Sequence, residues 1–220
     1  MIFVDRRDAG KKLAKEIAKI ISKDEKVVVL GLPRGGVAVG FEVAKILKAP
    51  LDVCICRKLG APGQEELAIG AVAEGGERVL DDQLINSLGI SQQEIERITA
   101  REQKEIKKRV VLYREGKPLP DLAGKTVVLA DDGVATGLTA EAAVKSIKKL
   151  SPKEIIFAVP VGAVDSIKKL KALVNDLVCL SAPPEFSAVG EWYRDFSQVT
   201  DGEVMEMLTG SNGQPKWKVG

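Results

Sequence analysis

The chain has 220 residues, of which 45% are hydrophobic and 29% are charged, and its formal net charge is +2. This length and balance suit a single globular domain and give no reason to expect a nucleic-acid or membrane partner. Histidine is absent, which excludes Ser–His and Cys–His nucleophiles and most zinc sites. Any general acid or base must therefore be a carboxylate, a lysine, a tyrosine or the substrate itself.

The cysteines and the amino-terminal residues bear on the cellular compartment. Cys54 and Cys56 share one face of a predicted strand, far along the chain from Cys179, and without histidine they make a poor metal set. We interpret them as buried free thiols, which are typical of a reducing compartment. The first residues mix acids and bases where a signal peptide has an apolar run, and no apolar run approaches membrane-spanning length. We expect a cytoplasmic protein.

The first predicted elements flank a glycine-rich turn. Asp8 is a typical helix cap, and apolar spacing predicts a helix over about residues 9–22. A buried strand over 27–30 and a buried helix over 37–47 enclose the turn Leu32-Pro33-Arg34-Gly35-Gly36. Its glycines expose backbone N–H groups, and its arginine offers two donors to phosphate oxygens. The turn is a candidate phosphate site; the alternative is a tight turn that needs glycine for packing.

A charged segment follows the next predicted strand, which covers 51–56. Residues 57–66 are rich in glycine and proline, so we expect a mobile loop that opens with the cations Arg57 and Lys58. The alternative for these cations is a solvated basic pair. Two short strands, 69–73 and 78–80, are predicted to pair around a Gly75-Gly76 turn.

Residues 81–117 differ in character from the rest of the chain. Ser91 and Glu94 form a capping-box signature that opens a helix running to about Tyr113. The apolar stripe of this helix is thin, so we expect an added helical arm packed on one side, not a second core. We interpret the basic run 104–109 as a solvated face.

The most informative stretch is 126–139. A buried strand leads into Asp131 and Asp132, then into a loop of small and hydroxylated residues, and a helix is predicted over 140–150. A strand, a Gly/Thr turn and a helix N-terminus make an anion site. The two acids cannot bind a phosphate themselves, but they suit sugar hydroxyls or a divalent metal. The alternative is an ordinary strand-to-helix turn with two solvated acids.

Two further strands, 155–159 and 177–180, enclose a helix over 164–173. Strands that alternate with helices predict a parallel sheet with right-handed crossovers. The loops 31–36, 57–66 and 131–139 each follow a strand, so they should meet at one sheet edge. The tail after residue 182 holds most of the aromatic side chains, and we expect 211–220 to be poorly ordered.

These motifs together resemble the type I phosphoribosyltransferases. The stretch 127–139 looks like their phosphoribosyl-pyrophosphate loop, with an apolar run, two acids, three mixed residues and Thr-Gly-x-Thr. The Pro-Arg-Gly-Gly turn is similar to their pyrophosphate loop, which often carries a non-proline cis peptide. The run Arg57-Lys58-x-Gly60-x-Pro62-Gly63 resembles their flexible catalytic loop, particularly that of adenine enzymes. With other matches from Asp5-Arg6 to Trp192-Tyr193-x-Asp195-Phe196, the resemblance covers nearly all of the chain and points to a subgroup of predicted phosphoribosyltransferases.

The resemblance implies a fold and an activity. The fold is a Rossmann-like parallel sheet flanked by helices, in a single domain over 1–220 with a helical insertion at about 81–117 and a small hood at about 182–220. The activity is transfer of the 5-phosphoribosyl group from phosphoribosyl pyrophosphate, with Mg²⁺, to a nitrogenous acceptor such as a nucleobase or related heterocycle, with release of pyrophosphate. A homodimer is also expected.

The resemblance also assigns residues. The 5-phosphate would lie on Ala135, Thr136, Gly137, Leu138 and Thr139. The acids Asp131 and Asp132 would act in catalysis and engage the ribose, directly or through the metal. The leaving pyrophosphate would bind Arg34, Gly35, Gly36, Arg57 and Lys58, of which the last two would also be catalytic.

The acceptor is less defined. Ala135 stands where hypoxanthine–guanine enzymes carry an aspartate, which puts a 6-oxopurine in doubt. Glu74 falls where adenine enzymes place a base-facing glutamate. Trp192, Tyr193 and Phe196 offer stacking faces, although they could equally form a small satellite core.

Two other functions fit parts of the sequence. A protein of this fold could sense phosphoribosyl pyrophosphate as a regulatory or assembly subunit without turning it over. The near-neutral charge and the Arg57-Lys58 pair favour the enzyme. A dinucleotide-binding dehydrogenase would need a Gly-x-Gly-x-x-Gly turn after the first strand, which is missing.

Overall fold

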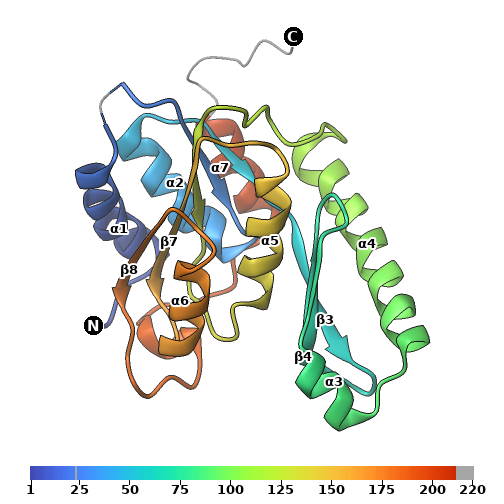
Figure 1. Ribbon diagram of the computed structural model, residues 1–220. Helices are drawn as coiled ribbons and strands as arrows, with labels where there is room; N and C mark the ends of the chain where they lie inside the picture. Colours follow the sequence, from blue (N-terminus) through green and yellow to red (C-terminus); the bar gives the residue numbers. More distant parts are fainter. Residues whose placement is uncertain (23, 212–220) are drawn as a thin grey trace.

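The computed structural model describes residues 1–22 and 24–211, so the expectation for 211–220 falls almost wholly outside the described residues. A five-stranded parallel sheet forms its centre (Figure 1), in the order β2-β1-β6-β7-β8. Its strands are β1 (Val27–Gly31), β2 (Leu51–Val53), β6 (Thr126–Ala130), β7 (Glu154–Val161) and β8 (Asp176–Ser181). The predicted parallel α/β sheet is therefore confirmed.

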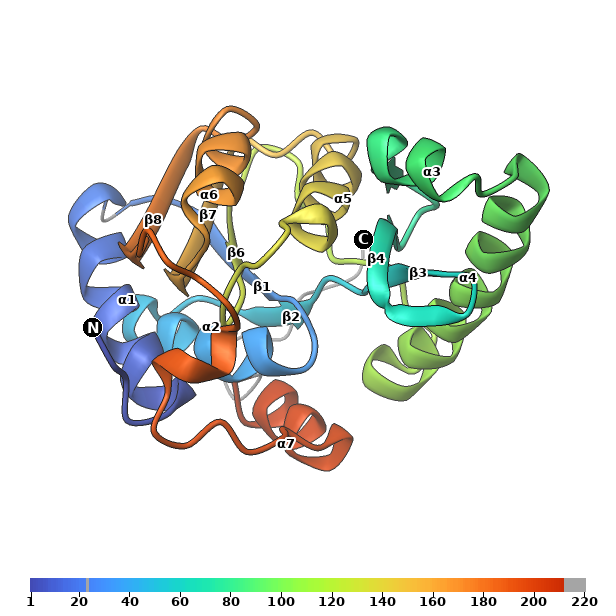
Figure 2. The same cartoon turned by 90° about the horizontal axis from the view of Figure 1, so that it is seen from below.

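Helices cover both faces of this sheet (Figure 2). One face carries α1 (Arg6–Ile20), α2 (Gly35–Leu47) and α7 (Asp201–Ser211), and the other carries α5 (Leu138–Lys148) and α6 (Val164–Lys171). Because both faces are buried, the central strands are apolar at nearly every position. Along β6, Val127 and Leu129 join the α5 side of the core, and Val128 joins the α1–α2 side.

The strand order places a crevice between β1 and β6. The chain moves from β1 outward to β2 and then returns to the other side of β1 to form β6. Neighbouring loops leave such a reversal point in opposite directions, and ligands of open parallel sheets bind there, beyond the carboxyl ends of the strands. The loops after Gly31 and Ala130 flank this point.

Residues 57–66 are not the mobile loop that we expected. They belong to an antiparallel sheet of β3 (Cys56–Ala61), β4 (Gln64–Ala73) and β5 (Arg78–Leu80). The turn between β3 and β4 is short, with Gly63 at φ 74°. The glycines and charges concealed an apolar face, since Leu59 and Ala61 are buried in the same cluster as Ile69. The predicted pairing of 69–73 with 78–80 is confirmed, with Gly75 and Gly76 both at positive φ.

The segment after β5 forms two helices, α3 (Asp82–Leu88) and α4 (Gln92–Arg114), where we expected one. The predicted capping box of Ser91 and Glu94 opens α4. Ile95, Ile98 and Ile106 bury the apolar stripe of α4 in the cluster that holds the hairpin residues. The β3–β4 hairpin therefore lies between α4 on one side and α5 on the other (Figure 2).

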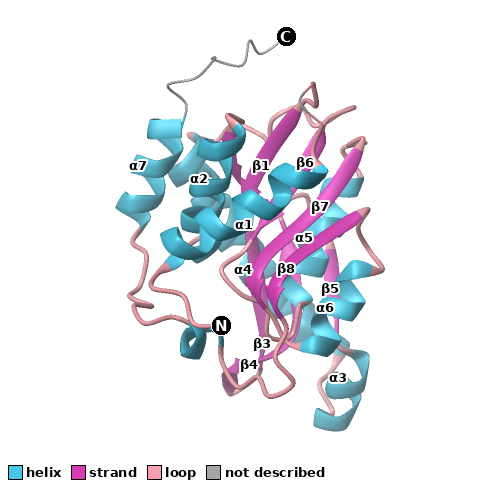
Figure 3. Ribbon diagram, turned by 90° about the vertical axis from the view of Figure 1, so that its left-hand side faces the viewer, coloured by secondary structure: helices cyan, strands magenta, loops and turns pink. Residues whose placement is uncertain are grey.

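The two ends of the described chain wrap the same face. Asp5, not Asp8, caps α1, because its side chain accepts from the backbone N–H of Asp8. Phe3 pairs with Tyr193 beside the short η1 helix (Val189–Trp192). Helix α7 was not predicted; it lies outside α2 (Figure 3). No helix in the described part of the chain is long and apolar enough to cross a membrane.

Candidate active site

Two helix N-termini open at the crevice between β1 and β6. Helix α2 begins at Gly35, directly after a cis peptide between Pro33 and Arg34, and α5 begins after Gly137, whose φ is 79°. Neither Arg34 nor Gly137 caps its helix with a side-chain hydrogen bond. The first backbone N–H groups of both helices are therefore available, and both helix dipoles favour an anion at this place.

The two glycines of the first turn allow the loops to touch. A Cβ on Gly36 would lie 2.6 Å from the carbonyl oxygen of Ala130 and 2.8 Å from the Cα of Asp131. A Cβ on Gly35 would collide with Asp132 Oδ2. Only glycine permits such approaches. The structure thus brings together the Arg34–Gly36 turn and the acid pair that the sequence singled out.

Asp131 and Asp132 differ in their surroundings. The Asp131 carboxylate is half-buried, and its Oδ1 accepts a 2.8 Å hydrogen bond from the backbone N–H of Asp132. Burial, and then the negative charge of Asp132, raise the pKa of Asp131 well above its usual range. A cation or a hydroxyl donor placed here would relieve this repulsion.

Arg6 holds Asp132, and sequence reasoning gave it no role. Its Nε donates a 2.6 Å hydrogen bond to Asp132 Oδ2, and its Nη1 donates to the carbonyl oxygen of Ser197 at 2.8 Å. The guanidinium lies 3.8 Å from the ring centre of Phe196. The Tyr193 hydroxyl donates a 2.5 Å bond to the carbonyl oxygen of Asp132. An Asp5-Arg6 pair formed part of the family resemblance, and that was the only signal available.

The 5-phosphate candidates form the turn that leads into α5. Ala135 and Thr136 are exposed, and Gly137, Leu138 and Thr139 are half-buried. The turn is anchored from outside, since Ser166 Oγ donates to the carbonyl oxygen of Ala135 at 2.5 Å. The backbone of Val134 is fixed in turn by a 3.0 Å bond to Val161. The turn is therefore held in shape with its exposed residues directed outward.

Arg34 reaches an acid of the unpredicted helix. Its Nη1 lies 3.7 Å from Asp201 Oδ1, and the Tyr113 hydroxyl at the end of α4 donates to the same carboxylate atom. Burial, with the hydrogen bond and charge of Asp201, raises the pKa of Tyr113 to about 12. The first turn of α7 thus links Arg34 to the helical arm.

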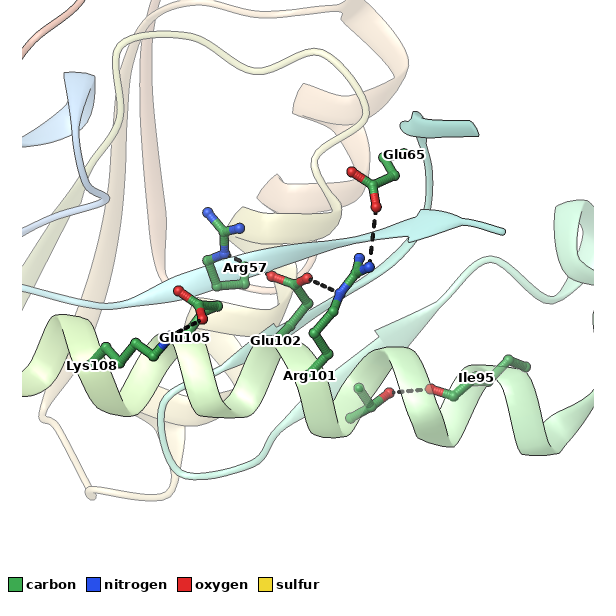
Figure 4. Close-up of polar contacts among 8 residues, drawn as sticks. Arg57, Glu65, Ile95, Arg101, Glu102, Glu105 and Lys108 are labelled. Carbon is green, nitrogen blue, oxygen red and sulfur yellow. Dashed lines mark hydrogen bonds and ion pairs between the residues drawn. The ribbon is translucent and has the colours of Figure 1, made fainter. Parts of the chain in front are cut away.

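Arg57 and Lys58 lie on β3 and not in a loop, and Figure 4 shows Arg57 on this strand. Arg57 Nε donates a 2.9 Å hydrogen bond to Glu102 of α4, and Lys58 Nζ donates a 3.0 Å bond to Glu66 across the hairpin. The prediction of a mobile loop at this place is therefore wrong. Both cations do follow β2 along the chain, as predicted.

Of the residues proposed for the acceptor, Tyr193 and Phe196 pack together with ring centres 5.1 Å apart, but Glu74 has other partners. Glu74 forms an ion pair with Arg114 at the junction of the hairpin and the arm. Trp192 stacks on Phe186 with ring centres 6.4 Å apart, and Tyr193 is buried beneath Asp132. Within residues 1–22 and 24–211, no contact joins Glu74 to these aromatic side chains.

The three cysteines are free, and Cys54 and Cys56 are buried. Burial raises the pKa of the Cys56 thiol and that of Cys179, so neither is an activated nucleophile. The described residues contain no group of three or more acidic or cysteine side chains that could hold a metal alone. The adjacent carboxylates of Asp131 and Asp132 nevertheless suit a hard cation that takes its remaining oxygen ligands from a substrate or water.

Comparisons with known proteins agree with this geometry. The model of the phosphoribosyl transferase domain matches residues 4–193. Two curated proteins from strains of Mycobacterium tuberculosis are 42% identical to the chain over 207 residues, and their names assign a phosphoribosyl transferase activity only provisionally. The match covers 94% of this chain and 46% of each relative, so the chain spans about half the length of the curated relatives it matches.

Solved structures share the architecture. The crystal structure of TT1426 from Thermus thermophilus is 44% identical with a TM-score of 0.79, and the match covers 96% of this chain and 99% of that one. AQ2163 from Aquifex aeolicus is 16% identical with a TM-score of 0.50, over 80% of this chain and 73% of that one, which shows a shared fold alone.

Proposed function

We propose, from the premise that the chain belongs to the phosphoribosyl transferase domain family, that it transfers 5-phosphoribosyl groups from phosphoribosyl pyrophosphate to a nitrogenous heterocycle. In this reaction a ring nitrogen of the acceptor forms a bond to C1 of the ribose. The bond from C1 to the pyrophosphate oxygen breaks, and pyrophosphate leaves with the electron pair. The anomeric carbon is inverted, and the acceptor nitrogen gives up its proton to water.

The observation that carries this proposal is the pair of uncapped helix N-termini on either side of Asp131 and Asp132. A substrate with a phosphate at one end and a pyrophosphate at the other, joined by a sugar, matches that order. The α5 terminus with Ala135, Thr136, Gly137, Leu138 and Thr139 would hold the 5-phosphate. Arg34, Gly35 and Gly36 at the α2 terminus, with Arg57 and Lys58, would hold the pyrophosphate.

The acids would act on the sugar between these two anion sites. Asp131 and Asp132 would accept hydrogen bonds from the ribose hydroxyls, and their negative charge would stabilise the positive sugar of the transition state. Arg6 holds the Asp132 carboxylate in a fixed orientation for this task. Mg²⁺, held by these carboxylates directly or through water, would neutralise the charge of the departing pyrophosphate.

Binding and turnover test the proposal separately. Isothermal titration calorimetry with phosphoribosyl pyrophosphate and Mg²⁺ should give micromolar-range binding, and Asp131→Asn with Asp132→Asn should abolish it. Asp82→Asn, an exposed acid on α3, is the matched control and should bind as the wild type does. Unchanged binding by the double variant would overturn the site assignment.

A panel of nucleobases and related heterocycles, each with the sugar pyrophosphate and Mg²⁺, then tests the reaction through pyrophosphate release. Adenine-like bases should release more than 6-oxopurines, since Ala135 replaces the aspartate of the hypoxanthine–guanine enzymes. Clear binding without release for any acceptor would favour a sensor of phosphoribosyl pyrophosphate. Variants of Glu74, Trp192, Tyr193 and Phe196 would show which of them selects the acceptor. Light scattering would test the expected homodimer.

A further inference from the structure

The helical arm supplies a buried carboxylate to the hairpin that carries Arg57. Glu102 lies on α4, and only 6% of its side chain is exposed. Its Oε2 accepts a 2.9 Å hydrogen bond from Arg57 Nε, and its Oε1 accepts a 3.0 Å bond from Arg101 Nε (Figure 4). A carboxylate that is so enclosed is stable as an ion only with such partners. Glu102 and Arg57 are therefore a fixed pair, formed between two elements far apart in the sequence.

The geometry of this pair leaves the end of Arg57 available. The contact uses Nε alone, and among residues 1–22 and 24–211 the terminal nitrogens Nη1 and Nη2 make no hydrogen bond. Figure 4 shows the two terminal nitrogens of Arg57 pointing away from the Glu102 carboxylate. Two parallel N–H donors in a fixed plane are the arrangement that binds phosphate oxygens in a bidentate manner. Glu102 thus binds the Nε side of the Arg57 guanidinium and leaves Nη1 and Nη2 available to a ligand.

Lys58, the other cation of the β3–β4 hairpin, is held less firmly than Arg57. Its partner Glu66 belongs to the same hairpin, and the Glu66 side chain is fully exposed. Lys58 Nζ also donates to the Glu66 backbone carbonyl oxygen at 3.0 Å. Both contacts are exposed and lie within one hairpin, and an exposed ion pair contributes little to stability. Arg101, which shares Glu102, extends instead to Glu65 near the hairpin tip at 3.1 Å. Of the two cations of the hairpin, only Arg57 is fixed by a buried charge from the arm.

We propose that Glu102 is a positioning residue, which fixes Arg57 through Nε so that Nη1 and Nη2 are preorganised for the pyrophosphate group. The inference rests on the proposed function, which supplies that anion. An arginine side chain has many rotamers, and a ligand that must order it loses affinity. Glu102 would order Arg57 before the substrate arrives, without contacting the substrate itself. This role would explain why the chain carries the helical insertion that contains α4.

Calorimetry with inorganic pyrophosphate and Mg²⁺ tests this role. Glu102→Ala should weaken binding about tenfold, the usual effect of losing one hydrogen bond to a charged group. Glu102→Gln should stay within about threefold of the wild type, because its amide oxygen still accepts from Arg57 Nε. Glu102→Met, which keeps the volume but has no oxygen acceptor, should resemble Glu102→Ala and serves if that variant does not fold. Glu96→Gln, an exposed acid on the same helix, is the control and should bind normally.

A double-variant cycle separates positioning from a general structural effect. In an Arg57→Ala background, Glu102→Ala should cause no further loss of pyrophosphate affinity. In turnover, Glu102→Ala should raise KM for phosphoribosyl pyrophosphate more than it lowers kcat. A loss that persists without Arg57, or wild-type affinity in both Glu102→Ala and Glu102→Met, would overturn the inference alone. If the wild-type protein binds neither the sugar pyrophosphate nor pyrophosphate, the proposed function falls and this inference with it.

Discussion

Arg6 and Asp132 lie 126 positions apart in the chain, yet Arg6 Nε donates a 2.6 Å hydrogen bond to Asp132 Oδ2. Only 11% of the Arg6 side chain and 16% of the Asp132 side chain are exposed. The bond occupies one carboxylate oxygen and fixes the direction of the other. The first turn of α1 is therefore part of the site, although it is far along the chain from the loops 31–36 and 131–139 by which the site was recognised.

Replacing Arg6 should weaken substrate binding. Arg6→Ala removes a charge-assisted hydrogen bond and leaves Asp132 free to rotate, so the affinity for phosphoribosyl pyrophosphate with Mg²⁺ should fall about tenfold. Calorimetry gives the measurement. Arg7→Ala, on the exposed face of the same turn, is the matched control. Equal affinities in Arg6→Ala and Arg7→Ala would show that Asp132 does not need its partner.

Gly36→Ala should separate the two loops of the site. The added Cβ would stand 2.6 Å from the Ala130 carbonyl oxygen, and a backbone contact of that kind cannot be relieved by rotating a side chain. Overpacking should destabilise the fold by about 2 kcal/mol, and substrate binding should be lost. Urea unfolding measures the first effect. Gly210→Ala, where nothing lies within 4 Å, should leave both properties intact.

The hairpin should be well protected from solvent even without substrate. The paired parts of β3 and β4 lie between two helices, and residues of the middle strand β4 such as Ala71 have partners on both β3 and β5. Hydrogen exchange should therefore be slow there. The exposed turn at Pro62 and Gly63 should exchange quickly. Rapid exchange along the whole of 57–66 would instead support the mobile loop that the sequence first indicated.

Asp52 should make stability depend on pH. Burial, opposed by a hydrogen bond from Val53 and by the charge of Arg114, raises the pKa of Asp52 from 3.8 to about 6. The folded state therefore binds a proton that the unfolded state has lost, and stability falls as pH rises from about 4 to about 6. Asp52→Asn should remove this fall. The variant should match the wild type near pH 4 and exceed it by about 3 kcal/mol at pH 7.

Urea unfolding at both pH values checks this difference, with the exposed Asp82→Asn as control. Parallel pH profiles for Asp52→Asn and the wild type would contradict the prediction.

The elements that were predicted correctly from the sequence have one thing in common: residues close to one another in the chain determine each of them. The buried strands, the Ser91–Glu94 cap and the Gly75-Gly76 turn each depend on residues within a few positions of one another. The Asp131-Asp132 stretch was found for the same reason, because strand, acids and turn are contiguous. Three loops were expected at one edge of a parallel sheet. The close approach of Gly35 to Asp132 agrees with that expectation for 31–36 and 131–139, but 57–66 forms a hairpin instead.

What was missed depends on distant partners. Arg6 and Glu102 are ordinary residues until the fold places Asp132 or Arg57 beside them. Tyr193 was named for stacking on an acceptor, and its contact with the Asp132 carbonyl oxygen depends on the fold. The hairpin was mistaken for a loop because its glycines and charges outweighed the alternation of Leu59 and Ala61, which only α4 and α5 make favourable. Helix α7 carries too weak an apolar pattern to be recognised without its neighbour α2.

The pairing of Phe3 with Tyr193 bears on how the protein is made. During synthesis Phe3 and Arg6 leave the ribosome well before their partners Tyr193 and Asp132. Until the later segments have been made, β1 lacks its neighbour β6, and α2 and β2 lack the packing of α7. A fragment that ends before Tyr193 leaves Phe3 without its partner and the Asp132 carbonyl oxygen without the Tyr193 hydroxyl, so the surroundings of Asp132 are complete only after this segment has folded.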